Sequence, residues 1–175
     1  YHPTRKLALD LAFFINGVPV GTCEIKTNFT QSIEEAVRQY RTDRKPVENG
    51  KKHPLLTPGR GALVHFALSD SEIRMTTKLN GENTVFLPFN KGYGDGAGNP
   101  PGQNDYPVAY FWKEILEPES WLRIFHAFAY VEKKNKVGKD GKPYKAENLI
   151  FPRFHQLRAV NKMVRHARQY GPGHR

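Results

Sequence analysis

The chain has 175 residues, enough for one domain with a sizeable core, and 38% of them are hydrophobic, so we expect a folded protein. Lys and Arg outnumber Asp and Glu by 27 to 17, and the net charge of +10 favours a polyanionic partner, nucleic acid before an anionic membrane, although a solvated basic surface is the plain alternative. No stretch approaches the run of about 18 apolar residues that a membrane span requires, and the single cysteine, Cys23, excludes an internal disulfide and suits a reducing, cytoplasmic setting.

The N-terminal part of the sequence predicts a β-hairpin followed by a helix. Apolar residues fill 6–15 and 18–27 on either side of Asn16-Gly17, and this pattern is a strong hairpin signal. Residues 31–43 carry apolar side chains at helical spacing, with acidic residues in the first turn, and Pro46 ends the helix.

The remaining elements complete an α/β pattern with a mixed, mostly antiparallel sheet flanked by helices. Residues 132–147 are rich in lysine, contain glycine and have almost no apolar residues, so we expect a linker or mobile loop there. The other expected segments are a hairpin of 62–69 and 72–79, a short strand in 84–89, an irregular Gly- and Pro-rich loop in 91–105, helical structure in 107–131 with a break near Pro118, and a helix in 151–170.

Two carboxylates and a lysine stand inside the first predicted hairpin. Acidic residues are depleted in strands, so Asp10 on one arm and Glu24 on the other need a reason. Lys26 lies two residues after Glu24 and therefore shares its strand face. The carboxylates of Asp10 and Glu24 can hold Mg²⁺, and the metal can activate water for phosphodiester hydrolysis. The amine of Lys26 can stabilise the oxyanion that develops during the reaction. The alternative is an exposed Glu24–Lys26 salt bridge.

The register of this hairpin decides whether the three side chains converge. If Asn16-Gly17 formed a two-residue turn with regular pairing, Asp10 would pair with Cys23, and Glu24 would point to the opposite face. A three-residue loop or a β-bulge removes the conflict. The catalytic interpretation therefore predicts one of these two features, with Gly17 at positive φ.

The spacing of Asp10, Glu24 and Lys26 resembles the PD-(D/E)xK nuclease superfamily. With the flanking segments the resemblance is closer: LDLAFFINGVPVGTCEIK, IEEAVRQYRTDR, LVHFA, MTTKL, FLPFNKG, GAGNPP and LIFPRFHQLRAV together resemble the restriction (R) subunit of type I restriction enzymes. The order and spacing of these segments match over nearly the whole chain.

The resemblance implies a restriction-endonuclease-like fold and a site-specific deoxyribonuclease that cleaves double-stranded DNA with Mg²⁺. It implies Asp10 and Glu24 as metal ligands and Lys26 as the catalytic lysine. It further implies an ATP-driven translocase of the superfamily 2 helicase type and a complex with modification (methyltransferase) and specificity subunits. The alternative function is a non-catalytic DNA-binding or assembly domain that keeps the nuclease fold.

The resemblance also extends to a helix residue. Members of the family carry a glutamine and a tyrosine four residues apart on the helix after the lysine. Gln39 resembles that glutamine, but Asp43 stands at the tyrosine position, and we interpret Tyr40 as a core aromatic residue. The basic residues Arg38, Arg41, Arg44 and Lys45 near this helix either contact phosphates or form a solvated helix end.

Residues 151–156 resemble the Q motif that precedes the first helicase strand, which implies that Gln156 and Arg153 contact an adenine nucleotide. No GxxxxGK followed by Ser or Thr occurs in the sequence. We therefore expect residues 1–131 to form a nuclease domain with further sequence upstream, 132–148 a basic linker or mobile loop, and 149–175 the start of the helicase/translocase domain, cut before its phosphate-binding loop.

Overall fold

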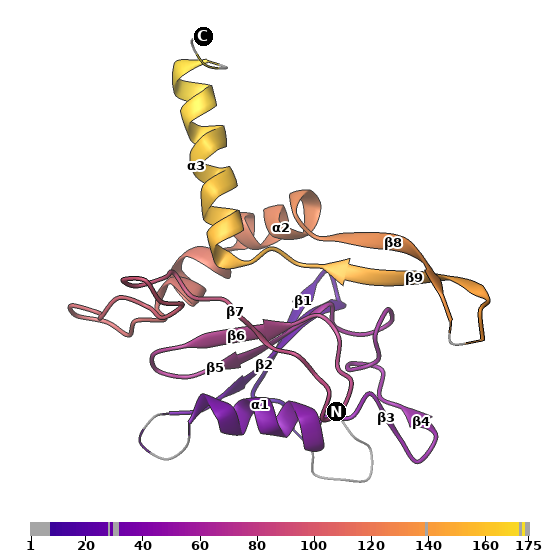
Figure 1. Cartoon of the computed structure of the whole chain (residues 1–175). Helices are drawn as coiled ribbons and strands as arrows, with labels where there is room; N and C mark the ends of the chain where they lie inside the picture. The colour runs from indigo at the N-terminus through magenta and orange to yellow at the C-terminus, as the bar shows by residue number, and fades with distance from the viewer. Residues whose placement is uncertain (1–7, 28, 30–31, 139, 172, 174–175) are drawn as a thin grey trace.

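A five-stranded mixed sheet forms the centre of the computed structural model, which describes residues 8–27, 29, 32–138, 140–171 and 173. The strand order is β1-β2-β5-β6-β7, and every neighbouring pair is antiparallel except β2 and β5, which are parallel (Figure 1). The predicted α/β class with a mixed, mostly antiparallel sheet is confirmed. The strands are β1 (Leu11–Ile15), β2 (Val18–Ile25), β5 (Val64–Leu68), β6 (Ile73–Thr76) and β7 (Leu87–Pro88).

The β1–β2 hairpin combines a tight turn with a bulge. Asn16 and Gly17 both have positive φ, at 48° and 80°, and Ile15 pairs with Val18 directly across them. The register then shifts between Phe13 and Phe14, because Phe14 pairs with Pro19 whereas Phe13 pairs with Gly21. Val20 is thus the extra residue of a β-bulge. Of the two features that the sequence required, the bulge is the one present.

Helix α1 (Ile33–Thr42) covers one face of the sheet (Figure 1). Ile33, Ala36 and Val37 are buried and pack against Ala67 of β5. Ala67 is small, so the helix backbone can approach the strand closely. The predicted helix is therefore confirmed at 33–42, and its acidic first turn complements the partial positive charge of the helix N-terminus.

The opposite face of the sheet carries an aromatic core. Phe66 of β5 lies at its centre, with ring centroids 4.9 Å from Phe111 and 5.6 Å from Phe89. These edge-to-face contacts add to the stabilisation from burial. The core is closed by the short π-helix η1 (Phe111–Ile115) and by α2 (Pro118–Ala127), so the predicted helical break near Pro118 is confirmed.

The segment expected to be a linker or mobile loop is instead a two-stranded antiparallel ribbon. β8 (Tyr130–Val137) and β9 (Pro143–Ile150) pair along their whole length, and the described residues of the ribbon are mostly exposed. Lys133 forms an ion pair with Glu147 of the facing strand at 3.3 Å. Continuous backbone pairing forms the ribbon without the apolar alternation that predicts a strand from sequence, and exposed cross-strand pairs of this kind add little to its stability. The expectation of helical structure up to residue 131 was also wrong, because β8 begins at Tyr130.

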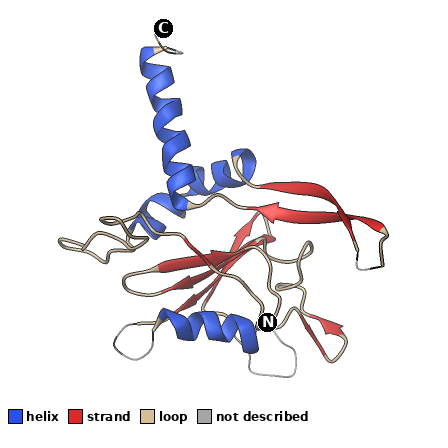
Figure 2. Ribbon diagram, viewed as in Figure 1, coloured by secondary structure: helices blue, strands red, loops and turns tan. Residues whose placement is uncertain are grey.

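Two further elements surround this framework. A small hairpin, β3 (Val47–Glu48) and β4 (Lys51–Lys52), was not predicted from the sequence. The predicted C-terminal helix is confirmed as α3 (Phe154–Tyr170), which extends away from the sheet (Figure 2). Phe154 and Leu157 of α3 are buried in the aromatic core, whereas most of the helix beyond them is exposed. The division of the chain into domains stays a prediction.

No helix in the described part of the chain combines the length and the apolar character that crossing a membrane requires.

We predict that Gly21→Ala destabilises the fold. A Cβ at position 21 would lie 2.9 Å from Cδ2 of Phe13 and 3.5 Å from Cζ2 of Trp121, which pack over the strand beside the bulge. Overpacking of this kind costs about 1–3 kcal/mol, measurable by urea denaturation. Gly98→Ala is the matched control, because a Cβ there meets nothing within 4 Å. Equal free energies of unfolding for the two variants would contradict this packing.

Candidate active site

The bulge brings Asp10 to the level of Glu24 at one end of the hairpin. Leu11 pairs with Cys23, so the next position on each strand places Asp10 opposite Glu24. Oδ2 of Asp10 accepts a hydrogen bond of 2.7 Å from the backbone N–H of Ile25, the residue between Glu24 and Lys26. The predicted bulge and the positive φ of Gly17 are confirmed, and Asp10 and Lys26 both lie near enough to Glu24 to affect its pKa, where β1 begins and β2 ends.

Glu24 is a buried carboxylate held by an arginine. Its side chain is 1% exposed, and Oε1 accepts a hydrogen bond of 2.6 Å from Nε of Arg44. Nη2 of Arg44 also donates to the carbonyl of Ala8, just before β1, at 2.7 Å. Burial raises the pKa of Glu24 above its ordinary value, and the nearby Asp10 carboxylate adds to this rise, whereas Arg44 and Lys26 oppose it.

A buried hydrogen-bonded chain supports this strand from the α1 side. Oγ1 of Thr22 lies 2.8 Å from the hydroxyl of Tyr40 and 2.7 Å from Nδ1 of His65. Burial lowers the pKa of His65 to about 3, so the imidazole is neutral. If Tyr40 donates to Thr22 and Thr22 donates to His65, every hydroxyl proton has an acceptor. The interpretation of Tyr40 as a core aromatic residue is confirmed, and His65 is a buried histidine held by a hydrogen bond.

Lys26 is partly buried, and its ammonium forms no ion pair with any residue that the structure describes. It lies close enough to Glu35 of α1 to help lower the pKa of that carboxyl, after the larger effect of the hydrogen bond from Arg38. Gln39 follows Glu35 by one helical turn, so the two side chains share a flank of α1. Oε1 of Gln39 is shielded from solvent and has no hydrogen-bond partner among the described residues.

Arg44 is the functional candidate that the sequence did not single out. It was grouped with Arg38, Arg41 and Lys45 as either a phosphate contact or a solvated helix end. In the structure Arg38 pairs with Glu35, Arg41 donates to the carbonyl of Thr84, and Arg44 turns inward to Glu24. The sequence offered only a basic residue two positions past the end of a helix, beside Arg41 and Lys45, and nothing in it distinguished Arg44 from these neighbours.

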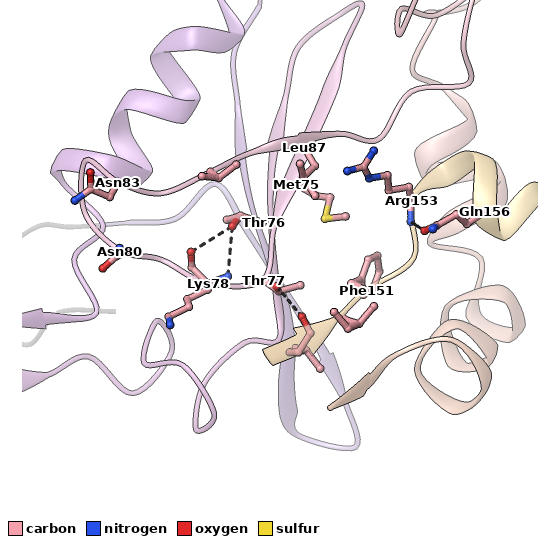
Figure 3. Close-up of a pocket in the computed structure, with 13 residues that line it drawn as sticks. Met75, Thr76, Thr77, Lys78, Asn80, Asn83, Leu87, Phe151, Arg153 and Gln156 are labelled. Atoms are coloured by element: carbon pink, nitrogen blue, oxygen red, sulfur yellow. Dashed lines mark hydrogen bonds between the residues drawn. The ribbon is translucent and has the colours of Figure 1, made fainter. Parts of the chain in front are cut away.

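Gln156 and Arg153 lie outside the carboxylate cluster, at the start of α3. They line a pocket of about 450 Å³ between the end of β6 and the start of α3, together with Lys78, Asn80 and other residues (Figure 3). Oε1 of Gln156 accepts a hydrogen bond of 2.9 Å from the backbone N–H of Arg153, which caps α3. This contact uses the amide oxygen and leaves the amide N–H groups of Gln156 for another partner.

The donors at the hairpin suit a hard divalent cation. Oε2 of Glu24 and Oδ1 of Asp10 accept no hydrogen bond from any described residue, so each carboxylate keeps one oxygen for a ligand. Among the described residues, no group of three or more His, Cys, Asp or Glu side chains is arranged to hold a metal ion. A cation here would rest on two carboxylates and complete its shell with water, as Mg²⁺ commonly does.

We predict that Arg44→Met destabilises the protein in a pH-dependent manner. The substitution leaves Glu24 as a buried charge without its ion-pair partner, which costs about 3–5 kcal/mol while the carboxyl is ionised. The pKa of Glu24 is already raised, so lowering the pH protonates it and reduces the loss. Urea denaturation at several pH values tests this, with Arg41→Met as control. A loss that stays constant with pH would contradict it.

We also predict that His65 makes the fold sensitive to acid. Its pKa is about 3 in the folded protein and about 6.5 in the unfolded chain, so the unfolded state binds the proton more readily. The contribution of neutral His65 is complete above pH 6.5 and is lost as the pH falls from there towards 3. His65→Asn keeps an acceptor for Thr22 without titrating, so its free energy of unfolding should fall less over this range. The control His166→Asn changes an exposed histidine, and its stability should depend on pH as that of the unmodified chain does. If the stability of His65→Asn also shows this pH dependence, His65 is not the source of the acid sensitivity.

Comparison with known proteins adds one family. Comparison with curated proteins gives no match, and comparison with solved structures gives none either. The family model described as "Type I restriction enzyme R protein N terminus" matches residues 2–84, which include the β1–β2 hairpin, α1, β5 and β6. Residues 2–84 of this chain, just under half of its length, are therefore similar to the N terminus of type I restriction enzyme R proteins.

Proposed function

We propose that this chain contains a Mg²⁺-dependent endonuclease site that cleaves double-stranded DNA within a type I restriction system. One observation carries the proposal. In a chain with this family match, Asp10 and Lys26 lie near Glu24 at one end of a hairpin, and Lys26 forms no ion pair with any described residue. A surface Glu–Lys salt bridge, the plain alternative, does not fit a Glu24 side chain that is 1% exposed and bound to Arg44.

The residues divide the reaction among them. A bound Mg²⁺ would polarise the scissile phosphate and lower the pKa of a water molecule. Asp10 and Glu24 would each offer one carboxylate oxygen to the cation. Lys26 would stabilise the negative charge that develops on the phosphate oxygens, and the unsatisfied amide oxygen of Gln39 would accept a hydrogen bond from water in the site. Arg44 keeps Glu24 in place without contacting the reacting atoms.

The family match supports a role for the chain in a multi-subunit restriction complex that acts on DNA. We propose that its partners are the modification and specificity subunits, that ATP-driven translocation precedes cleavage, and that Gln156 and Arg153 contact the nucleotide. The pocket that these two residues line, and the unused amide N–H groups of Gln156, support the last point (Figure 3). A cytoplasmic location follows from the same function.

The competing function is a non-catalytic DNA-binding or assembly domain with a nuclease-like fold. Metal binding separates the two, because an assembly domain has no need for a cation between Asp10 and Glu24. Isothermal titration with Mn²⁺ as a probe should give a site that Asp10→Asn or Glu24→Gln removes. A chain that binds Mn²⁺ equally well with and without these carboxylates would favour the assembly function.

We predict that Lys26→Ala or Glu24→Ala abolishes DNA cleavage by the intact restriction complex while ATP turnover and translocation continue. Loss of Glu24 removes a metal ligand, and loss of Lys26 removes transition-state stabilisation worth about 10²- to 10³-fold in rate. DNA affinity should change little, because each cation contributes a small share to phosphate binding. The assay compares nicking and ATP hydrolysis on one circular DNA that carries a recognition site.

Lys51→Ala is the matched control, because Lys51 is an exposed lysine of β4, outside the carboxylate cluster. It should cleave at the rate of the unmodified protein. Near-normal cleavage by Lys26→Ala would exclude the proposed role of the lysine. Parallel loss of cleavage and ATP turnover in a variant with an unchanged melting temperature would show that the two activities do not depend on separate sites.

A further inference from the structure

A cleft lined by basic side chains lies on the face of the sheet opposite to α1, away from the carboxylates of the candidate active site. This cleft, of about 420 Å³, opens between α3 on one wall and η1 and α2 on the other. These helices cover the face of the sheet opposite to α1 (Figure 1). The cleft therefore has no part in holding the cation between Asp10 and Glu24, and its composition needs a separate explanation.

Cations dominate the lining of this cleft. Arg158, Lys162 and Arg165 stand at intervals of four and three residues on α3, so they form one row on a helix face. Arg123 of α2 and Lys91, in the loop between β7 and η1, also line the cleft.

The only acidic residue among the lining side chains, Glu114, is already engaged by Lys91 at 3.0 Å. Arg123, Arg158, Lys162 and Arg165 form no ion pair with any residue in the described part of the chain. Most of the arginines of the α1 face, by contrast, are neutralised: Arg38, Arg44 and Arg74 each bind a carboxylate.

An uncompensated cluster of this kind costs free energy in the isolated chain. Like charges one helical turn apart repel each other, and the concave shape concentrates the positive potential. The buried base of the cleft, formed by Ile115, Phe154 and Leu157, holds the two walls together despite this repulsion. An anion bound between the walls would remove the repulsion.

We propose that this cleft binds the phosphate backbone of duplex DNA as a contact separate from the cleavage site. The proposal rests on the proposed function for the identity of the polyanion. Guanidinium groups bind phosphate oxygens in two-point contacts, which suits a site with three arginines. A lining made mainly of cations binds the phosphate backbone and makes no hydrogen bonds to base edges, so the contact binds DNA independently of sequence.

The test is binding of a fluorescent 30-base-pair duplex to the chain, followed by anisotropy over a range of salt concentrations. The variant Arg158→Gln/Lys162→Gln/Arg165→Gln keeps good helix formers on exposed positions of α3. It should weaken binding by at least about tenfold at low salt and reduce the dependence of log affinity on log salt concentration by about 2 to 3.

The matched control, Lys51→Gln/Lys52→Gln/Arg60→Gln, removes the same charge from exposed residues elsewhere and should weaken binding less than about threefold. Equal losses in both triple variants would overturn the proposal, because net charge alone would then explain them. Arg123→Gln tests the other wall of the cleft without altering α3, and it should weaken binding more than the single control Arg60→Gln. Unchanged affinity in Arg123→Gln, with the folded state verified by circular dichroism, would also overturn it.

Inorganic triphosphate distinguishes the source of the phosphate. Triphosphate and sulfate are compared as competitors at equal charge. If triphosphate displaces the duplex at far lower concentrations than sulfate does, and the duplex binds no more tightly than triphosphate, the cleft is a site for small anions. The proposal then fails. The nuclease proposal is judged separately, by cleavage in Lys26→Ala. Loss of duplex affinity in the α3 triple variant, with cleavage unaffected by Lys26→Ala, would support the cleft and reject the nuclease site.

Discussion

The extra residue in β2 is the constraint on which the candidate site depends. A two-residue turn at Asn16-Gly17 sets one register, and Val20 changes it by one position before the strands reach Asp10 and Glu24. Because side chains alternate between the faces of a strand, this single residue moves Glu24 from the aromatic side of the sheet to the α1 side. Without the bulge, Cys23 would occupy the place opposite Asp10, and the two carboxylates could not act on one ligand.

The sheet separates two kinds of interior that serve different purposes. On one face, Phe66 and its aromatic neighbours form a dry core that fixes α2 and the start of α3. On the other face, polar side chains of β2 bond to α1 and the residues after it, as Thr22 does to Tyr40 and Glu24 to Arg44. Buried polar groups are costly when unpaired, so these bonds hold the strand end rigidly in the position that a metal site would require.

The elements with strong local patterns were predictable from the sequence, whereas those made by pairing were not. The Asn16-Gly17 hairpin and α1 follow from turn chemistry and helical spacing, and the residues of the candidate site follow from charges in strands. The β8–β9 ribbon was missed because its residues are polar and its strands are held by each other, as in the Lys133–Glu147 pair. The role of Arg44 was also hidden, because no local pattern shows that a residue past a helix end turns inward to a strand.

The raised pKa of Glu24 shows that Arg44 compensates its burial only in part. Arg44 contacts one oxygen of the carboxylate, Asp10 nearby adds negative charge and Lys26 offsets it, so the ionised form of Glu24 stays incompletely stabilised in its poorly solvated place. A divalent cation would stabilise this carboxylate more strongly than it would an exposed one, because electrostatic interactions weaken as water approaches. The same burial that makes Glu24 unfavourable in the chain alone would therefore strengthen its attraction for a metal ion.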